Sequence, residues 1–282
     1  MNTLTAKTPF ITNSIVLDPP ATGYLCFKKP ARASKRLKKN VIRMDEIISK
    51  YLTCVSLGSS ISHGGMTVFP VFAPPVAEEH DYLTLSEAMD LGVLHITEVS
   101  EAGDVPELMA VNTGKAAILM IDGELLVGAK QDRAVNTTLL LPPESETVIP
   151  VSCTERGRWG YTSREFRSTD YVISSESRRR KMRSVSESLK QKGSFASDQG
   201  EVWDDCASLN RKTGAQSASG AMRDSFEAKR QEIEELISAF PIQPHQRGVV
   251  VIIYDLLAVG LEIISRDDAF AKLYSKLLHS SI

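Results

Sequence analysis

One segment of the sequence concentrates side chains that could do chemistry. Between two apolar stretches it carries acids, cations and amides: Asp122, Glu124, Lys130, Gln131, Asp132, Arg133 and Asn136. Carboxylates can act as general acids or bases or hold a metal, cations can bind an anion, and amides can orient a ligand. The pattern predicts a hairpin whose turn and flanks carry these groups. A solvated hairpin with charge pairs across its strands is the alternative.

A second polar segment, Cys153 to Tyr161, follows the next apolar stretch. Loops after strands often carry functional residues. Cys153 could be a nucleophile, but a nucleophile needs a base and none of the five histidines lies in either segment. A buried structural thiol is therefore favoured. Trp159, beside Arg156 and Arg158, could stack on a base while the arginines hold phosphates. Alternatively, the ring covers an edge of the core and the arginines pair with acids.

Three strings carry a family resemblance: GELLVGAKQDR, then NTTLLLPPESETVIPVSCTERGRW, and later DQGEVW. From about residue 60 to the C-terminus, the chain resembles the uncharacterised ARPP-1 family, the ARG- and rhodanese-phosphatase-superfamily-associated proteins. The resemblance implies an α+β domain whose polar residues suggest enzymatic activity, in a context of ADP-ribose or NAD metabolism. It implies a fold and a candidate site more firmly than a reaction.

The family pattern matches individual positions of this chain. They are Asp122, Gly123, Glu124, Gly128, Lys130, Gln131, Arg133, Asn136, Cys153, Glu155, Gly157, Arg158 and Trp159, with Gln199 and Trp203 in the later block. At Asp132 the family often has Asn, so this chain carries an extra negative charge beside Lys130.

These matches lead to the hypothesis that the two polar segments meet in space. Glu124 or Glu155 would then be the acid–base group, with a divalent metal on Asp122 as a candidate cofactor. The remaining candidates would bind a nucleotide-like ligand: Lys130, Arg133 and Arg158 a pyrophosphate, Gln131 and Asn136 the polar groups around it, and Trp159 a base.

Composition narrows the class of protein. The 282 residues are 42% hydrophobic, enough for one large domain or two small ones. The four cysteines form no C-x-x-C pair, which excludes a cysteine zinc ribbon and predicts a reducing cytoplasm. The most apolar stretch, 248–264, contains two acids and is too short to span a membrane. It predicts a buried β-hairpin, and we expect no membrane association.

Charge is distributed unevenly along the chain. Residues 1–43 carry nine Lys or Arg and a single acid, so the rest of the chain is acidic. We interpret 1–43 as a basic, disordered extension, a targeting peptide or an over-extended start before Met44. An acidic body makes nucleic acid an unlikely partner. The basic run Arg178–Arg183 leaves a nucleic-acid contact as a hypothesis, and a solvated helix face as its alternative.

The elements that must position these residues change character along the chain. Short apolar runs separated by turn residues predict strands from 66 to 153, interrupted by one helix that begins at the capping-box spacing Thr84–Glu87. Helices are predicted at 174–191, through 202–203, at 221–240 and at 267–278, with the apolar hairpin at 249–264. The fold class is α+β, and 44–282 is predicted to be a single domain.

Three functions follow as hypotheses. The first is a cytoplasmic enzyme, a hydrolase acting on a ligand related to ADP-ribose or NAD. The second is a non-catalytic module that binds a nucleotide or a protein, and the third is a nucleic-acid-associated factor. The sequence leaves the substrate, the use of a metal and the oligomeric state open.

Overall fold

The structure is a computed structural model and describes residues 15–16, 48–74, 81–100, 106–253 and 258–281. The chain divides into two compact units. Of the described residues, the first unit holds 81–241 and 272–281, and the second holds 15–16, 48–74 and 242–271. The fold is mixed α+β, as predicted, with a strand-rich middle followed by helices. The single domain over 44–282 stays a prediction beside this division.

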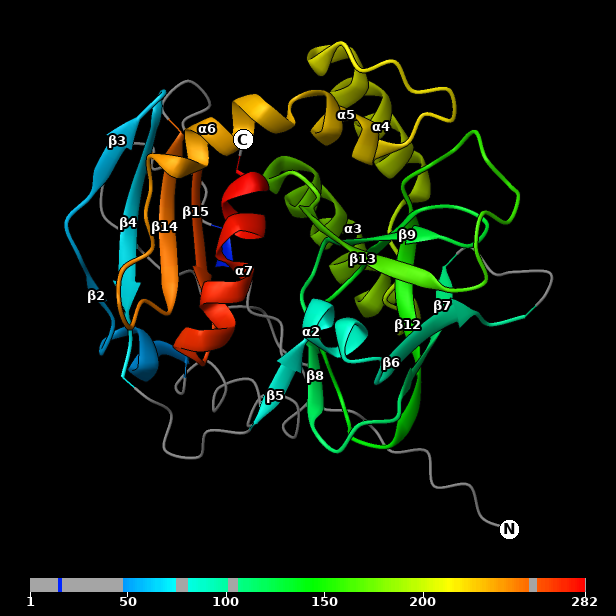
Figure 1. Cartoon of the computed structure of the whole chain (residues 1–282), viewed down its shortest axis with the longest axis horizontal. Coiled ribbons are helices and arrows are strands. Elements are labelled where there is room, and N and C mark those ends of the chain that lie inside the picture. Colours follow the sequence, from blue (N-terminus) through cyan, green and yellow to red (C-terminus); the bar gives the residue numbers. More distant parts are fainter. Residues whose placement is uncertain (1–14, 17–47, 75–80, 101–105, 254–257, 282) are drawn as a thin grey trace. The chain divides into compact units, whose positions relative to one another are not determined.

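The first unit is built on an antiparallel sheet whose described strands number six. Their order is β13 (Phe166–Val172), β9 (Glu124–Gly128), β10 (Arg133–Val135), β12 (Ser145–Cys153), β7 (Glu107–Asn112) and β6 (Leu94–Glu98). A second group of described strands contains β11 (Leu139–Leu141), β8 (Ala117–Met120) and β5 (Tyr82–Thr84), and in it β5 runs parallel to β8. Figure 1 shows these strands in cyan and green.

Helices α2 (Leu85–Asp90) and α3 (Ser175–Lys192) begin where the sequence predicts, and α4 (Gln199–Thr213) contains the predicted helical residues 202–203. Thr84 and Glu87 form the expected capping box at α2. Ser174 accepts a hydrogen bond from the Ser177 N–H at the start of α3, and Asp198 caps α4 in the same way. Each cap satisfies amide groups that the first turn of a helix leaves unpaired.

The single helix predicted over 221–240 is wrong. The structure has two helices, α5 (Met222–Ala228) and α6 (Arg230–Ser238), separated at Lys229. The backbone of Lys229 has φ of −114° and ψ of 9°, outside the helical region. The sequence shows no break because Lys is a good helix former and neither Gly nor Pro is present there. Helix α7 (Asp267–His279) agrees with its prediction.

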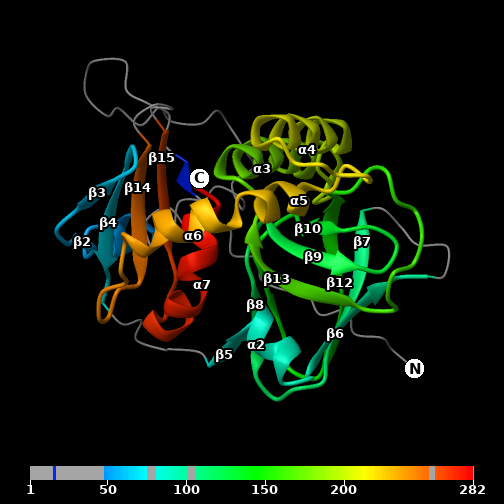
Figure 2. The ribbon, with the colours of Figure 1, turned by 45° about the horizontal axis from the view of Figure 1, so that its top comes forward.

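Strands β9 and β10 are buried on both faces. Leu126 and Val135 join an apolar cluster with strand residues such as Ile96. Their neighbours Leu125 and Ala134 point the other way, into a cluster with residues of α4, α5 and α6. Figure 2 shows α3, α4 and α5 lying along one side of these strands. Side chains alternate across a strand, so neither face of this hairpin is left to solvent.

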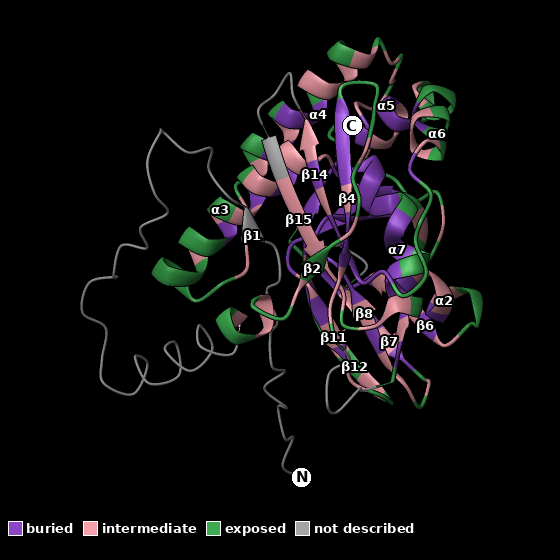
Figure 3. Cartoon of the chain, turned by 90° about the vertical axis from the view of Figure 1, so that its left-hand side faces the viewer, coloured by how far each residue is buried: buried purple, intermediate pink, exposed green. Residues whose placement is uncertain are grey.

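The second unit contains a sheet in the order β1 (Ile15–Val16), β15 (Ala258–Ile263), β14 (Gly248–Ile253), β4 (Met66–Phe72) and β2 (Ser56–Leu57), with β3 (Ile61–His63) also paired to β4. Strands β14 and β15 are the predicted apolar hairpin. β4 is largely buried (Figure 3). Residues 48–52 are helical, and helix α7 follows β15 in the sequence.

The basic extension is described only at Ile15 and Val16, which pair with Leu261 and Gly260 of β15. The predictions for the rest of 1–43 lie outside the described residues. Among the helices that the structure describes, none is long and apolar enough to cross a membrane.

Candidate functional site

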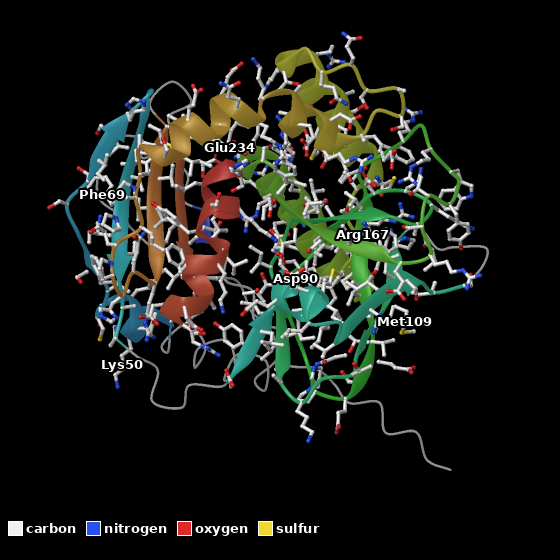
Figure 4. All side chains as sticks on the ribbon, viewed as in Figure 1. Lys50, Phe69, Asp90, Met109, Arg167 and Glu234 are labelled. Atoms are coloured by element: carbon white, nitrogen blue, oxygen red, sulfur yellow. The ribbon has the colours of Figure 1, made fainter. Side chains whose placement is uncertain are left out.

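The first polar segment forms the β9–β10 hairpin, and the second begins at the end of β12. Because β10 pairs with β12, Arg133 lies opposite Cys153 and Val135 lies opposite Val151. In Figure 4, Arg167 marks β13 and Met109 marks β7, and the two polar segments belong to strands between these in the sheet order. The two segments therefore lie side by side at the start of β10.

The hairpin is not solvated, so the alternative interpretation of this segment is wrong. Apart from Val127 and Gly128, which are half-buried, every residue from Asp122 to Asn136 is buried. The turn depends on Gly128, which has a φ of +125°. A Cβ atom there would lie 2.5 Å from the Ser163 hydroxyl oxygen and 2.8 Å from the Glu165 carbonyl oxygen. Glycine is the residue that this conformation and this space allow.

Two buried carboxylates, Asp132 and Glu155, meet beneath one arginine. Nη2 of Arg158 lies 2.5 Å from Oε2 of Glu155 and 3.1 Å from Oδ1 of Asp132. The Asp132 N–H also donates to Oε2 of Glu155 at 3.0 Å. Both carboxyl side chains are 2% exposed, whereas Arg158 keeps 18% of its side chain exposed. We refer to Asp132 and Glu155 as the carboxylate pair.

The surroundings of the two acids shift their pKa values in opposite directions. Burial, and then the charge of Glu155, raise the pKa of Asp132 from 3.8 to about 6. Burial also acts to raise the pKa of Glu155, but hydrogen bonds from Arg158, the Ser219 hydroxyl and the Asp132 N–H outweigh it, and the pKa is lowered. Two neighbouring carboxyl groups whose pKa values differ in this way are typical of acid–base sites, where one group carries a proton and the other is ionised.

An aromatic and cationic patch adjoins the turn. The ammonium group of Lys130 lies 5.3 Å from the ring centre of Trp159 and 5.1 Å from that of Tyr161. Both rings are 53% exposed, while Lys130 is buried. A cation over an aromatic face is attracted by the ring's electron density. We refer to Lys130, Trp159 and Tyr161 as the aromatic patch.

Several of the predicted site residues hold the backbone together. The side-chain amide of Gln199 donates to the Cys153 carbonyl at 2.8 Å and accepts from the Cys153 N–H at 2.8 Å. Asn136 donates to the Phe195 carbonyl at 3.0 Å. Gln131 donates to the Glu155 carbonyl at 2.8 Å. These contacts tie the hairpin, β12 and the segment before α4 to one another.

Cys153 and Arg133 lie within this buried network. The thiol of Cys153 is fully buried and lies 3.2 Å from Oε1 of Gln131, and burial raises its pKa. A thiol that is disfavoured as thiolate fits the structural role better than that of a nucleophile. Arg133 is also fully buried: its Nη1 donates to Gln131, and its Nη2 lies 3.8 Å from Glu98.

Asp122 and Glu124 lie near the opposite end of β10, where the Gly123 N–H donates to the Val135 carbonyl. The carboxylate of Asp122 pairs with Lys181 and, at 3.4 Å, with Nε of Arg178. Glu124 pairs with Lys276 at 3.1 Å. The predicted catalytic carboxylates thus divide between two places, and Glu155 alone of the three lies beside Arg158.

The basic run Arg178–Arg183 is largely engaged within its own unit. Arg178 and Lys181 are buried against Asp122. Arg180 pairs with Glu176 at 2.5 Å and with Asp205 at 2.6 Å. The face of α3 is therefore neither a free cationic stripe nor a merely solvated one, which weakens the nucleic-acid hypothesis.

The described residues were also considered as metal ligands. Within the described ranges, no group of three or more His, Cys, Asp or Glu side chains is placed to hold a metal ion. The metal suggested for Asp122 would have to compete with two cations for the same carboxylate.

Sequence reasoning missed three residues of this site. Asp132 is counted among the acids of the first polar segment but is given no catalytic role there, although it is one member of the carboxylate pair. Ser219 and Arg223 contact the pair from the loop before α5 and from α5 itself. Neither has a local sequence signal, because a contact made more than 60 positions away leaves no periodicity. The extra acid at 132, beside a family pattern that often has Asn there, was the one signal available.

The comparison with known families agrees with the resemblance. The model of the ARG and Rhodanese-Phosphatase-superfamily-associated Protein domain, ARPP-1, matches residues 54–282. No curated protein and no solved structure matches the chain.

Proposed function

Since this chain belongs to the ARPP-1 family, we propose that it is a hydrolase acting on a nucleotide-like ligand related to ADP-ribose or NAD, with its reaction centre at the carboxylate pair. The observation that carries the proposal is the pairing of Asp132 and Glu155 under Arg158, with their pKa values moved in opposite directions. The family name suggests the class of ligand, and the geometry supports acid–base chemistry.

The pair offers both halves of a hydrolytic step. Glu155, the ionised member, accepts a proton from the attacking water molecule. Asp132, with a pKa of about 6, donates its proton to the oxygen of the leaving group. An acid whose pKa lies near the working pH serves this purpose well, because it is protonated often enough and still releases its proton.

The aromatic patch and Arg158 supply the groups that a nucleotide needs. Trp159 and Tyr161 present exposed rings on which a base can stack, and stacking of this kind contributes about 1–3 kcal/mol per base. Lys130, adjacent to both rings, and Arg158, at the carboxylate pair, carry the positive charge that would attract the phosphates. A cytoplasmic location, where such nucleotides are abundant, is part of the same proposal.

Binding is tested first, with the full chain and a thermal-shift series of ADP-ribose, NAD, AMP and other mononucleotides. A ligand that binds the folded state alone stabilises it by about 2.7 kcal/mol at a hundredfold excess over Kd. We expect ADP-ribose or NAD to raise the melting temperature. The same increase should disappear in Trp159→Ala and Lys130→Ala, and persist in Glu165→Gln, which removes an exposed charge beside His95.

Turnover is tested next with the ligand that binds. We expect Glu155→Gln and Asp132→Asn to bind it and to lose about a hundredfold or more in kcat. Binding without turnover in the unmodified chain would instead support the binding module. If no nucleotide shifts a cooperative melting transition, the proposed ligand class is wrong.

A further inference from the structure

The segment 214–221 and the first turn of α5 are held against the carboxylate pair. The Ser219 hydroxyl donates to Oε1 of Glu155 at 2.6 Å. The Gly157 N–H donates to the Ser219 carbonyl at 2.7 Å, and the Met222 N–H donates to the Thr154 carbonyl at 2.9 Å. Ala221 also forms a β-bridge with Glu155. This part of the chain is therefore fixed in place by its backbone as well as by side chains.

Close approach at Gly157 makes this contact possible. A Cβ atom at Gly157 would lie 2.7 Å from the Ser219 carbonyl oxygen and 2.9 Å from its Cα. Both are backbone atoms, so they cannot swing aside as the end of a side chain can. Gly157, a residue of the family pattern, therefore leaves the space that Ser219 needs to reach Glu155.

Arg223, in the first turn of α5, contacts the other acid. Its Nε lies 3.2 Å from Oδ2 of Asp132 and 3.6 Å from Oδ1 of Asp224. The Arg223 side chain is 41% exposed and also contacts Asp224, so it stabilises an ionised Asp132 only in part.

The donors around the two acids are therefore unequal. Glu155 receives the Ser219 hydroxyl, the Asp132 N–H and Nη2 of Arg158, at 2.6, 3.0 and 2.5 Å. Asp132 receives the Gly128 N–H at 3.3 Å, Arg158 at 3.1 Å and the half-exposed Arg223. Short hydrogen bonds stabilise the ionised form of a carboxyl group, so Glu155 is the member of the pair that carries the negative charge.

We propose that Ser219 and Arg223 are positioning residues that assign the roles of the carboxylate pair: Ser219 keeps Glu155 ionised, and Arg223 weakens the binding of a proton by Asp132. The catalytic meaning of this assignment rests on the proposed function, but the distribution of the proton is a property of the free protein. Neither residue would need to touch the ligand.

The test follows the two carboxyl carbons directly. In the full chain, with ¹³C at the side-chain carboxyl groups of Asp and Glu, NMR titration identifies the two signals by their loss in Asp132→Asn and Glu155→Gln. In the unmodified chain, we expect the Asp132 carbon to titrate near pH 6 while the Glu155 carbon stays that of a carboxylate.

The two variants should act in different ways. Ser219→Ala removes a donor from Glu155, so the Glu155 carbon should begin to titrate together with that of Asp132. Arg223→Gln removes a cation from Asp132, so the Asp132 midpoint should rise by about half a pH unit, with the Glu155 carbon unchanged. Ser219→Thr and Arg223→Lys, which keep the hydroxyl and the charge, should restore the titration of the unmodified chain.

Two controls separate this effect from a general loosening. Ser217→Ala removes a hydroxyl of the same loop that donates to Asp224, and Arg230→Gln removes an exposed cation that pairs with Glu227. If Ser217→Ala moves the Glu155 signal as Ser219→Ala does, order in the loop is responsible and the role of Ser219 is wrong. If Ser219→Ala and Arg223→Gln both titrate as the unmodified chain does, the proposal fails as a whole. Because no ligand is present, such a failure is distinct from failure of the nucleotide hypothesis.

Discussion

Replacing Asp132 by Asn should stabilise the protein at neutral pH, although the residue belongs to a network of ion pairs. The folded state binds the proton of Asp132 with a pKa of about 6, against 3.8 for an unperturbed Asp. The folded state therefore holds more protons than the unfolded state between these values, and stability falls as the pH rises through them. Above pH 6 the full cost of the buried charge is present, and Asn does not carry it.

The magnitude follows from the same values. A difference of about 2 pH units at about 1.36 kcal/mol each corresponds to roughly 3 kcal/mol as an upper limit. The amide nitrogen of Asn would take the place of the oxygen that faces Arg223, and this unfavourable contact offsets part of the increase in stability. We expect a net increase of about 1–2 kcal/mol in the free energy of unfolding, or roughly 2–8 °C in Tm for a chain of this size.

Calorimetry of Asp132→Asn and of the unmodified chain between about pH 5 and pH 8 measures the effect. The advantage of the variant should be full near pH 8 and smaller by about 1.4 kcal/mol at pH 5, where Asp132 of the unmodified chain is mostly protonated in the folded state. Asp90→Asn, at an exposed position labelled in Figure 4, removes the same charge from the surface and should leave Tm nearly unchanged at every pH. A variant less stable than the unmodified chain at pH 8 would refute the reasoning, because the Asp132 carboxylate would then stabilise the fold.

Two further substitutions should act in the opposite direction. Lys181→Met leaves the buried Asp122 without its closest cation and should lower the free energy of unfolding, measured in urea, by about 3–5 kcal/mol. The double variant with Asp122→Asn should recover part of that loss. Equal instability of the single and double variants would contradict this. Gly157→Ala should lower Tm by an amount equivalent to about 1–3 kcal/mol, because its Cβ meets the backbone of Ser219. Gly160→Ala, where a Cβ would have no neighbour within 4 Å, is the matched control, and equal effects of the two would refute the steric argument.

Much of the fold could be predicted from the sequence because its signals are local. The capping box at Thr84, the apolar hairpin at 249–264 and the face of α7 depend on neighbours within a few positions. The break at Lys229 could not be found, since no residue there disfavours a helix. Strand β13 was also missed: its sequence FRSTDYV is polar, as suits the edge of a sheet, and lacks the apolar alternation of the other strands.

The candidate site could be predicted in part. The pairing of β10 with β12 brings together the segments that the family pattern marks. The cations that pair with Asp122 and Glu124 come from helices far away in the sequence, so the division between Glu155 on one side and Asp122 and Glu124 on the other could not be foreseen. A run of charges in a sequence does not show which of them will be buried.

The alternation of Leu125 and Leu126 into two different apolar clusters has a consequence for length changes. In a strand with one buried face, a slip by one residue turns the apolar side chains toward solvent. Here, the same slip would exchange the contents of both clusters at once. Turns usually tolerate inserted residues, but an insertion between Gly128 and Arg133 would shift β10 against β9 and β12 together. Variation in loop length should therefore accumulate elsewhere in this family, and the turn that carries Asp132 should keep its length.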